Sequence, residues 1–163
     1  MADVAGMLAL LVGQGATVAV AESLTGGLIG ATITSVAGAS KAFRGGVISY
    51  ATEVKRDVLG VPGELLRREG AVHPEVAAAM AAGAARLCEA TYGVAVTGVA
   101  GPEPQDGKPV GTVYAAVAGP GGKIWSRELK LDGSRERIRV GTVDEVVDLL
   151  SSVLKANVGE HSG

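Results

Sequence analysis

The amino-acid sequence predicts an α/β protein, a three-layer α/β/α sandwich around a mixed, mostly parallel sheet. Short apolar segments rich in β-branched residues alternate with longer segments of helical periodicity, as is typical of parallel strands joined by helices. A glycine-rich turn at 119–122 separates two strand-like segments and predicts one antiparallel hairpin. The length of 163 residues suits one domain.

The first part of the sequence predicts a helix, a strand and a second helix. Residues 3–14 repeat apolar side chains at helical spacing, and nearby glycines end this helix. Residues 17–21 are short, apolar and β-branched, as expected of a strand that is buried on both faces. Residues 22–27 then turn the chain into an apolar helical run that ends near Val36.

The middle of the sequence predicts a second strand and three helices. The strand covers residues 46–50, and a polar turn leads from it into a helix that begins near Thr52. Pro62 is expected at the first position of another short helix, where its missing N–H is no loss. Residues 74–90 are rich in alanine and predict a strong helix whose small side chains let neighbouring backbones approach closely.

The last part of the sequence predicts three strands and a terminal helix. Residues 93–97 predict a strand, and a loop rich in glycine and proline follows it over 98–107. Residues 110–118 and 123–131 are the two strands of the hairpin. Apolar residues at helical spacing predict a final helix over 134–155, and the residues after it are expected to fray.

Composition and charge bound the domain organisation, the partners and the compartment. We expect a single domain over 1–163 with its core at about 4–155. A net charge of −2 and an aromatic content of 3% disfavour a nucleic-acid surface, which needs clustered positive charge. The lone Cys88 favours a reducing compartment, and the apolar runs are shorter than a membrane span requires. We therefore expect a cytoplasmic protein with a small-molecule partner, no nucleic-acid or membrane partner, and no cofactor.

The chain has few residues of the types that bind transition metals. Two histidines and one cysteine disfavour a zinc site, and no metal is expected. A magnesium site built only from carboxylates stays open as an alternative.

Three polar, glycine-rich turns follow three of the predicted strands, at 22–27, 50–55 and 97–101. In an open α/β sheet, turns of this kind meet at one edge, so residues far apart in the sequence come together there. Ser23 stands just before a helix, where unpaired backbone N–H groups favour a phosphate or a tetrahedral oxyanion. The alternative for Ser23 is an ordinary N-cap.

A serine nucleophile needs a base. His73 is expected to start a helix and His161 lies in the tail, so Lys55 is the better candidate. Burial at a helix start pulls the pKa of a lysine down toward neutrality, and a serine and lysine pair is an established arrangement. The alternative is a solvated surface lysine that pairs with Glu53 or Asp57.

Further candidate ligands lie in the second half of the chain. The segment 97–101 offers small residues for close backbone approach to a ligand, or is an ordinary turn at a strand end. The segment 108–112 could close over the same ligand, or only lead into the next strand. Arg135 and Arg139 are four apart on a helix and suit a phosphate, with a solvated basic patch as the alternative.

Four motifs together resemble the C-terminal domain of the CinA (competence- and damage-inducible) family. They are AESLTGG at 21–27, GGVISY at 45–50 with Glu53 and Lys55 behind it, TGVAGP at 97–102 and KPVGTVY at 108–114. The resemblance covers about 4–150 and implies a mixed five-stranded sheet. It also implies an amidase that deamidates nicotinamide mononucleotide to nicotinate mononucleotide and ammonia. A chain of this length is expected to be the stand-alone domain, and a homo-oligomer, dimer or trimer.

The resemblance assigns roles to individual residues. Ser23 is the expected nucleophile, Lys55 its base, and Tyr50 lines the site. The expected substrate-binding residues are Glu22, Thr25, Gly26, Thr97, Gly98, Ala100, Gly101, Lys108, Gly111, Thr112, Arg135 and Arg139.

The sequence departs from the family pattern at three places, which are Leu24, Glu103-Pro104 and Ser134. A carboxylate at Glu103 could repel a phosphate or change the choice of substrate. Two alternatives to the nucleotide amidase therefore stay open: a non-catalytic nucleotide-binding domain, and an amidase for another small carboxamide.

Overall fold

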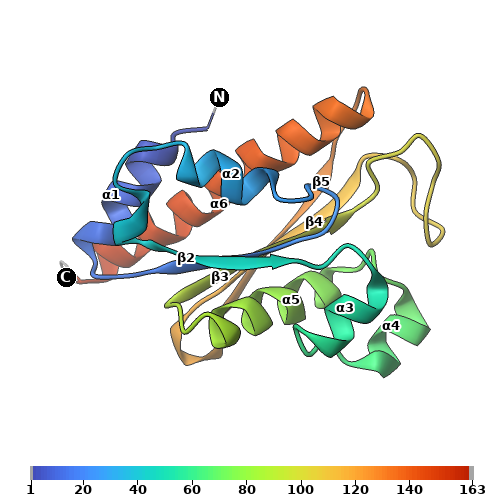
Figure 1. The fold of residues 1–163 in the computed structure, drawn as a ribbon, viewed down its shortest axis with the longest axis horizontal. Helices are drawn as coiled ribbons and strands as arrows, with labels where there is room; N and C mark the ends of the chain where they lie inside the picture. Colours follow the sequence, from blue (N-terminus) through green and yellow to red (C-terminus); the bar gives the residue numbers. More distant parts are fainter. Residues whose placement is uncertain (1, 162–163) are drawn as a thin grey trace.

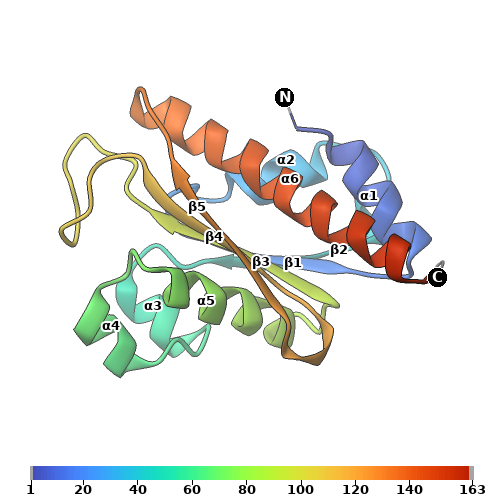
Figure 2. The same ribbon diagram turned by 180° about the vertical axis from the view of Figure 1, so that it is seen from behind.

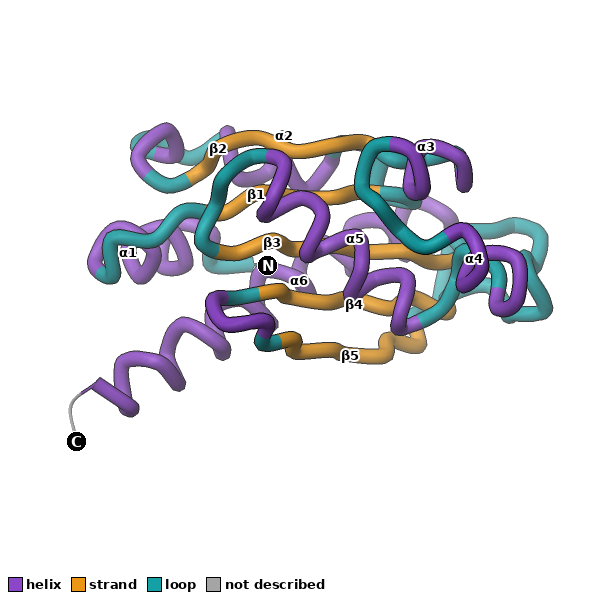
Figure 3. Tube along the Cα trace, turned by 90° about the horizontal axis from the view of Figure 1, so that it is seen from below, coloured by secondary structure: helices purple, strands orange, loops and turns teal. Residues whose placement is uncertain are grey.

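The computed structural model describes residues 2–161, and its five strands form one sheet in the order β2-β1-β3-β4-β5. The strands are β1 (Val18–Glu22), β2 (Phe43–Ile48), β3 (Tyr92–Gly98), β4 (Thr112–Ala118) and β5 (Ile124–Lys130). β1 pairs in parallel with β2 and β3, whereas β4 is antiparallel to β3 and to β5. The predicted mixed sheet is confirmed, with β4 alone running against the other four strands. Figure 3 shows the five strands side by side in this order.

Helices cover both faces of the sheet and complete the three predicted layers (Figures 1 and 2). One face carries α1 (Val4–Gly13), α2 (Leu28–Thr34) and α6 (Arg135–His161). The other carries α3 (Thr52–Asp57), α4 (Gly63–Glu69) and α5 (Pro74–Leu87). Two short 3₁₀ helices, Ala39–Lys41 and Pro120–Gly122, occupy connections. No helix among residues 2–161 has the length and apolarity to span a bilayer.

The core is divided by the sheet into two apolar layers, because the central strands are buried on both faces. Every residue of β1 and of β4 is buried, as their apolar and β-branched composition requires. The alanine-rich helix α5 lies close against β3. A Cβ added at Gly93 would stand 1.9 Å from the carbonyl oxygen of Ala81. The predicted close approach of the backbones is therefore present.

Several element boundaries differ from the predictions. The second strand begins at Phe43 and ends at Ile48 rather than covering 46–50, because Phe43 and Gly45 also pair with β1 and the paired register ends at Ile48. Pro62 precedes the first residue of α4 instead of occupying it. The final helix continues to His161, so the predicted fraying after Lys155 is wrong up to that residue. The end of the predicted tail, at 162–163, lies outside the described residues. A further difference, at the start of α2, belongs to the site.

Candidate active site

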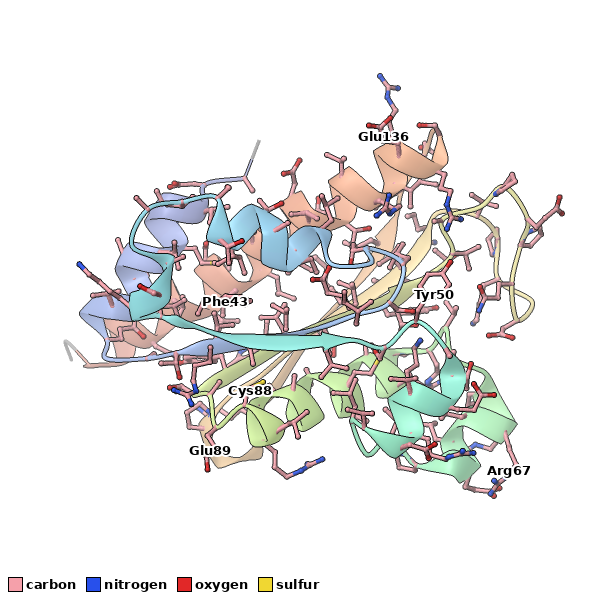
Figure 4. The ribbon with its side chains drawn as sticks, in the orientation of Figure 1. Phe43, Tyr50, Arg67, Cys88, Glu89 and Glu136 are labelled. Atoms are coloured by element: carbon pink, nitrogen blue, oxygen red, sulfur yellow. The ribbon has the colours of Figure 1, made fainter. Side chains whose placement is uncertain are left out.

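A cavity of about 380 Å³ opens where β1, β2 and β3 end, at the sheet edge where the three polar turns were expected to meet. Tyr50, 62% exposed, lies at this end of the sheet (Figure 4). The predicted site residues that line the cavity are Ser23, Tyr50, Lys55, Thr97, Gly98, Ala100, Gly101 and Arg135.

Ser23 and Lys55 are in direct contact inside this cavity. The Nζ atom of Lys55 lies 2.8 Å from the Oγ atom of Ser23, and the two residues are 1% and 8% exposed. Nζ also donates to the carbonyl oxygens of Ser49 (2.6 Å) and Tyr50 (3.2 Å). In its neutral form, the amine of Lys55 donates its two N–H groups to these two carbonyl oxygens. Its lone pair then faces the hydroxyl of Ser23. The alternative of a solvated lysine is wrong, since Lys55 is buried and Asp57 pairs with Arg56.

Burial lowers the pKa of Lys55 from 10.5 to about 8, and the negative charge of Asp106 opposes part of this shift. Desolvation disfavours the ammonium form, whereas a nearby carboxylate favours it. Asp106 belongs to the loop between β3 and β4, and its carboxylate accepts a hydrogen bond from the N–H of Ala71 (3.2 Å). A lysine with this pKa reaches its neutral, basic form at moderately alkaline pH.

The segment after Ser23 differs from the prediction. Helix α2 begins at Leu28, not directly after Ser23, and its N-cap is Gly27, so Ser23 caps no helix. The carboxylate of Glu22 accepts hydrogen bonds from the N–H groups of Gly27 (3.2 Å), Ile29 (2.9 Å) and Gly30 (3.0 Å). The expectation that the helix start offers unpaired N–H groups to an anion is wrong, because Glu22 already occupies them.

Two other backbone N–H groups follow the serine in the chain, and of these two residues Leu24 lines the cavity. Within the described residues, the backbone N–H groups of Leu24 and Thr25 donate no hydrogen bond. Both follow Ser23 directly in the turn. Backbone donors of this kind stabilise a tetrahedral oxyanion in acyl transfer.

Arg135 and Arg139 have separate contacts, although both were expected to face a phosphate. Arg135 lines the cavity and donates to the carbonyl oxygen of Gly101 and to the hydroxyl of Tyr50 (3.2 Å). Arg139 donates instead to the carbonyl oxygens of Leu24 and Thr25, both at 3.0 Å. Only Arg135 offers a guanidinium to the cavity.

The other predicted ligands lie outside the cavity lining. They are Glu22, Thr25, Gly26, Lys108, Gly111 and Thr112, together with Arg139. Lys108 stands over the ring of Tyr114, with Nζ 5.9 Å from its centroid. Gly111 donates to the carbonyl oxygen of Val99, which secures the loop against the start of β4. These contacts show how the segment 108–112 is held beside the site.

The lining also contains eight residues that were not named as ligands: Leu24, Thr52, Ala71, Val99, Pro102, Glu103, Pro104 and Gln105. Val99 lies within the predicted segment 97–101, and Glu103 is the carboxylate that was expected to affect a phosphate. Glu103 makes no hydrogen bond or ion pair within the described residues. Ala71 lies in the chain before α5, where nothing in the sequence indicated a site, and its carbonyl oxygen accepts from Thr97 (2.8 Å).

His73 starts a helix, as was expected. It is the N-cap of α5, and its Nδ1 accepts from the N–H of Glu75 (3.2 Å). The side chain of His161 lies outside the described part of the structure. Among the described side chains, no three of His, Cys, Asp or Glu are grouped to hold a metal ion.

Comparisons with known proteins agree with one another. The family model of the CinA C-terminal domain matches residues 3–154. A CinA-like protein of Frankia casuarinae is 55% identical over 91% of the chain, and one of Myxococcus xanthus is 43% identical over 87%. The chain spans 34% of the length of each of these two relatives.

Solved structures match over nearly the whole chain. The CinA superfamily protein of Klebsiella pneumoniae 700603 has a TM-score of 0.90 at 30% identity, over 94% of this chain and 96% of its own. The competence/damage inducible protein CihA of Agrobacterium tumefaciens has a TM-score of 0.86 at 36% identity, over 95% of this chain and 97% of its own.

Proposed function

The chain belongs to the CinA C-terminal domain family, and we propose that it hydrolyses the carboxamide of nicotinamide mononucleotide to give nicotinate mononucleotide and ammonia. The single observation that carries the reaction type is the contact of 2.8 Å between Lys55 Nζ and Ser23 Oγ, buried at the cavity. A nucleophile within hydrogen-bond reach of its base is the recurring arrangement of acyl-transfer sites.

The first half of the proposed reaction makes an acyl-enzyme. Ser23 Oγ attacks the carboxamide carbon while its proton passes to the neutral amine of Lys55. The carbonyl oxygen becomes an oxyanion, which the N–H group of the cavity-lining residue Leu24 stabilises. The tetrahedral intermediate then collapses, Lys55 returns the proton to the leaving nitrogen, and ammonia departs.

The second half hydrolyses the ester. A water molecule gives one proton to Lys55 and attacks the acyl carbon, and the same N–H group stabilises the second oxyanion. Collapse releases the carboxylic acid, which loses its proton to solvent, and Lys55 returns its proton to Ser23 Oγ. The net change is one water consumed and one ammonia released for each amide hydrolysed.

Cavity size and charge support a nucleotide substrate. The volume of about 380 Å³ falls within the range of small-molecule sites, ~300–1,000 Å³. Arg135 supplies the guanidinium for the phosphate, since its planar donors suit phosphate oxygens. No cofactor is required by the chemistry proposed.

A specific observation favours a second candidate, an amidase for a small carboxamide that carries no phosphate. The side chain of Glu103 lines the same cavity and has no cationic partner within the described residues. Its negative charge disfavours an anionic substrate by repulsion. A panel of nicotinamide mononucleotide, nicotinamide riboside and nicotinamide separates the two candidates.

The experiment that tests the proposal is ammonia release from nicotinamide mononucleotide by the wild type, Ser23→Ala and Lys55→Met. Loss of the nucleophile or the base is expected to lower kcat by about 10³-fold or more. Ser152→Ala is a matched control, because Ser152 lies exposed on α6 far along the chain from the cavity residues. A Ser23→Ala enzyme with the wild-type rate would rule out this mechanism. A wild type that binds the nucleotide tightly in calorimetry and releases no ammonia would point to the non-catalytic alternative.

A further inference from the structure

Glu22 is a buried carboxylate without a positive partner. The residue is 2% exposed, and no ion pair with it exists among the described residues. Its charge is met instead by three backbone N–H groups, those of Gly27, Ile29 and Gly30, at 2.9–3.2 Å. A buried carboxylate is retained at such a place only when hydrogen bonds replace its lost hydration. Glu22 therefore fixes the start of α2 onto the end of β1.

The turn 23–27 is also held from its other side. Arg139, on α6, donates hydrogen bonds to the carbonyl oxygens of Leu24 and Thr25. The guanidinium therefore binds carbonyl groups of the turn, whereas the Glu22 carboxylate binds N–H groups at the start of α2. The N–H of Gly26 donates to the carbonyl of Ser23 and closes the turn within itself. The turn thus has one hydrogen-bonded arrangement, set by residues from β1 and α6.

This double hold leaves two backbone donors free. The N–H groups of Leu24 and Thr25 belong to the peptide units on either side of Leu24, in the turn whose carbonyls accept hydrogen bonds from Arg139. Of these two residues, Leu24 lines the cavity, and it follows Ser23 directly. Any movement of α2 relative to β1 would therefore displace both the nucleophile and the oxyanion donor.

We propose that Glu22 is a positioning residue for the deamidation: its carboxylate anchors the N–H groups at the start of α2 and so holds Ser23 against Lys55 and the Leu24 donor toward the oxyanion. The inference rests on the proposed function. Glu22 does not line the cavity, so it acts through the turn and not by touching the substrate.

The first test uses Glu22→Gln, which keeps the size of the side chain. The amide NH₂ group of glutamine cannot accept a hydrogen bond, so at least one backbone N–H at the start of α2 loses its acceptor. We expect kcat to fall by about 10²-fold, as misplacement of a reacting group by an ångström does, while KM stays within about twofold. The matched control is Ile33→Val, which removes buried volume from α2 without touching the turn. This control is expected to lower the thermal midpoint and keep kcat.

The second test is independent of the physiological substrate. A fluorophosphonate probe reacts with an activated serine: Ser23 Oγ forms a bond to phosphorus, fluoride leaves, and the hydroxyl proton passes to Lys55. We expect labelling of Glu22→Gln to be about 10²-fold slower than that of the wild type, and labelling of Ile33→Val to be unchanged. Mass spectrometry of the labelled peptide identifies the serine.

The outcomes of the two tests separate the inference from the proposed function. The probe could label Ser23 faster in the wild type than in Glu22→Gln while the wild type releases no ammonia from the nucleotide. That result would support the positioning role and reject nicotinamide mononucleotide as the substrate. Wild-type labelling rates in Glu22→Gln would overturn the positioning role. So would equal losses in Glu22→Gln and Ile33→Val, which indicate general destabilisation. A wild type that the probe leaves unlabelled would overturn it as well, because the held turn would then not activate Ser23.

Discussion

The guanidinium of Arg135 donates a hydrogen bond to the hydroxyl of Tyr50 over 3.2 Å, at the cavity. This contact joins the first residue of α6 to the turn after β2, and the second contact of Arg135, with the carbonyl of Gly101, adds the loop after β3. One cation therefore ties together three segments that form the site. It is also the arginine that lines the cavity, which makes it the candidate phosphate ligand.

Replacing Arg135 should distinguish a phosphate-bearing substrate from one without phosphate. A hydrogen bond to a charged group contributes about 1.5–3 kcal/mol, so Arg135→Gln should raise KM for nicotinamide mononucleotide by about tenfold or more. KM for nicotinamide riboside should change by about twofold at most. Steady-state kinetics on both substrates measures the difference. Arg137→Gln, an exposed neighbour on α6, is the control. Equal increases for both substrates would show that Arg135 only supports the loop.

The rate of the proposed reaction should rise with pH. Because burial lowers the pKa of Lys55 to about 8, its protonated, inactive form predominates below that pH. We expect kcat/KM to increase tenfold per pH unit below a midpoint near 8 and to level off above it. Asp106→Asn removes the negative charge that raises the pKa of Lys55, so the midpoint should move to lower pH. A midpoint that stays in place or moves upward in this variant would contradict the assigned charge interaction.

The same lysine should make stability depend on pH. The pKa of Lys55 is about 8 in the fold against 10.5 for an ordinary lysine, so between these values the unfolded chain binds more protons. The free energy of unfolding of the wild type should therefore rise with pH across this window. Below about pH 8 both states are protonated and the full cost of about 3 kcal/mol is present.

Lys55→Met isolates this cost. Its free energy of unfolding relative to the wild type should be about 3 kcal/mol more favourable at pH 7 than at pH 10.5, because only the wild type carries the buried charge. Urea denaturation at the two pH values measures the change. Lys155→Met, at an exposed position of α6, should show no such dependence. A pH-independent difference for Lys55→Met would mean that Lys55 titrates normally in the fold.

The sequence allowed the site's location to be predicted because its principal residues follow strand ends. Parallel strands place their carboxyl ends together, so Ser23 after β1 and Lys55 after β2 were expected to meet, and they lie in contact. The role of Glu22 was not predictable in this way. Its partners are backbone N–H groups, which every residue except proline carries and which leave no pattern in the sequence.

Helical spacing alone also failed to separate the two arginines. Arg135 and Arg139 are one turn apart on α6, and one turn advances the helix by about 5.4 Å. That step is enough to bring Arg135 to Tyr50 and Gly101, and Arg139 to the turn after Ser23. The start of β2 was misjudged because Arg44 and Gly45 interrupt the apolar pattern before Gly46, whereas Phe43 and Gly45 pair with β1.

The contact between α5 and the sheet can be tested at Gly93. A methyl group there would stand 1.9 Å from the carbonyl oxygen of Ala81, and backbone cannot give way as a side-chain tip can. Gly93→Ala should therefore lower the free energy of unfolding by about 3 kcal/mol, the upper part of the range for overpacking. Gly13→Ala is the control, since nothing lies within 4 Å of its added methyl group. Chemical denaturation measures both, and similar stabilities of the two variants would show that α5 packs more loosely.

Thr25 offers a test of whether a side chain of the turn 23–27 contacts the substrate. Its Oγ1 is buried and has no hydrogen-bond partner among the described residues, and Thr25 does not line the cavity. Replacing an unsatisfied hydroxyl by a methyl group of the same shape is neutral or stabilising, so Thr25→Val should gain up to about 1 kcal/mol. Thr97→Val should instead lose about 1 kcal/mol, because Thr97 donates to the carbonyl of Ala71.

The kcat of Thr25→Val shows whether the hydroxyl of Thr25 binds substrate. The substitution leaves the backbone of the turn unchanged, including the N–H of Leu24 that the proposed mechanism uses, so kcat should stay within about twofold of the wild type. A fall in kcat of tenfold or more, in a variant that is no less stable, would show that the hydroxyl acquires a partner only when substrate binds. The threonine would then belong among the substrate ligands, as the family resemblance implied.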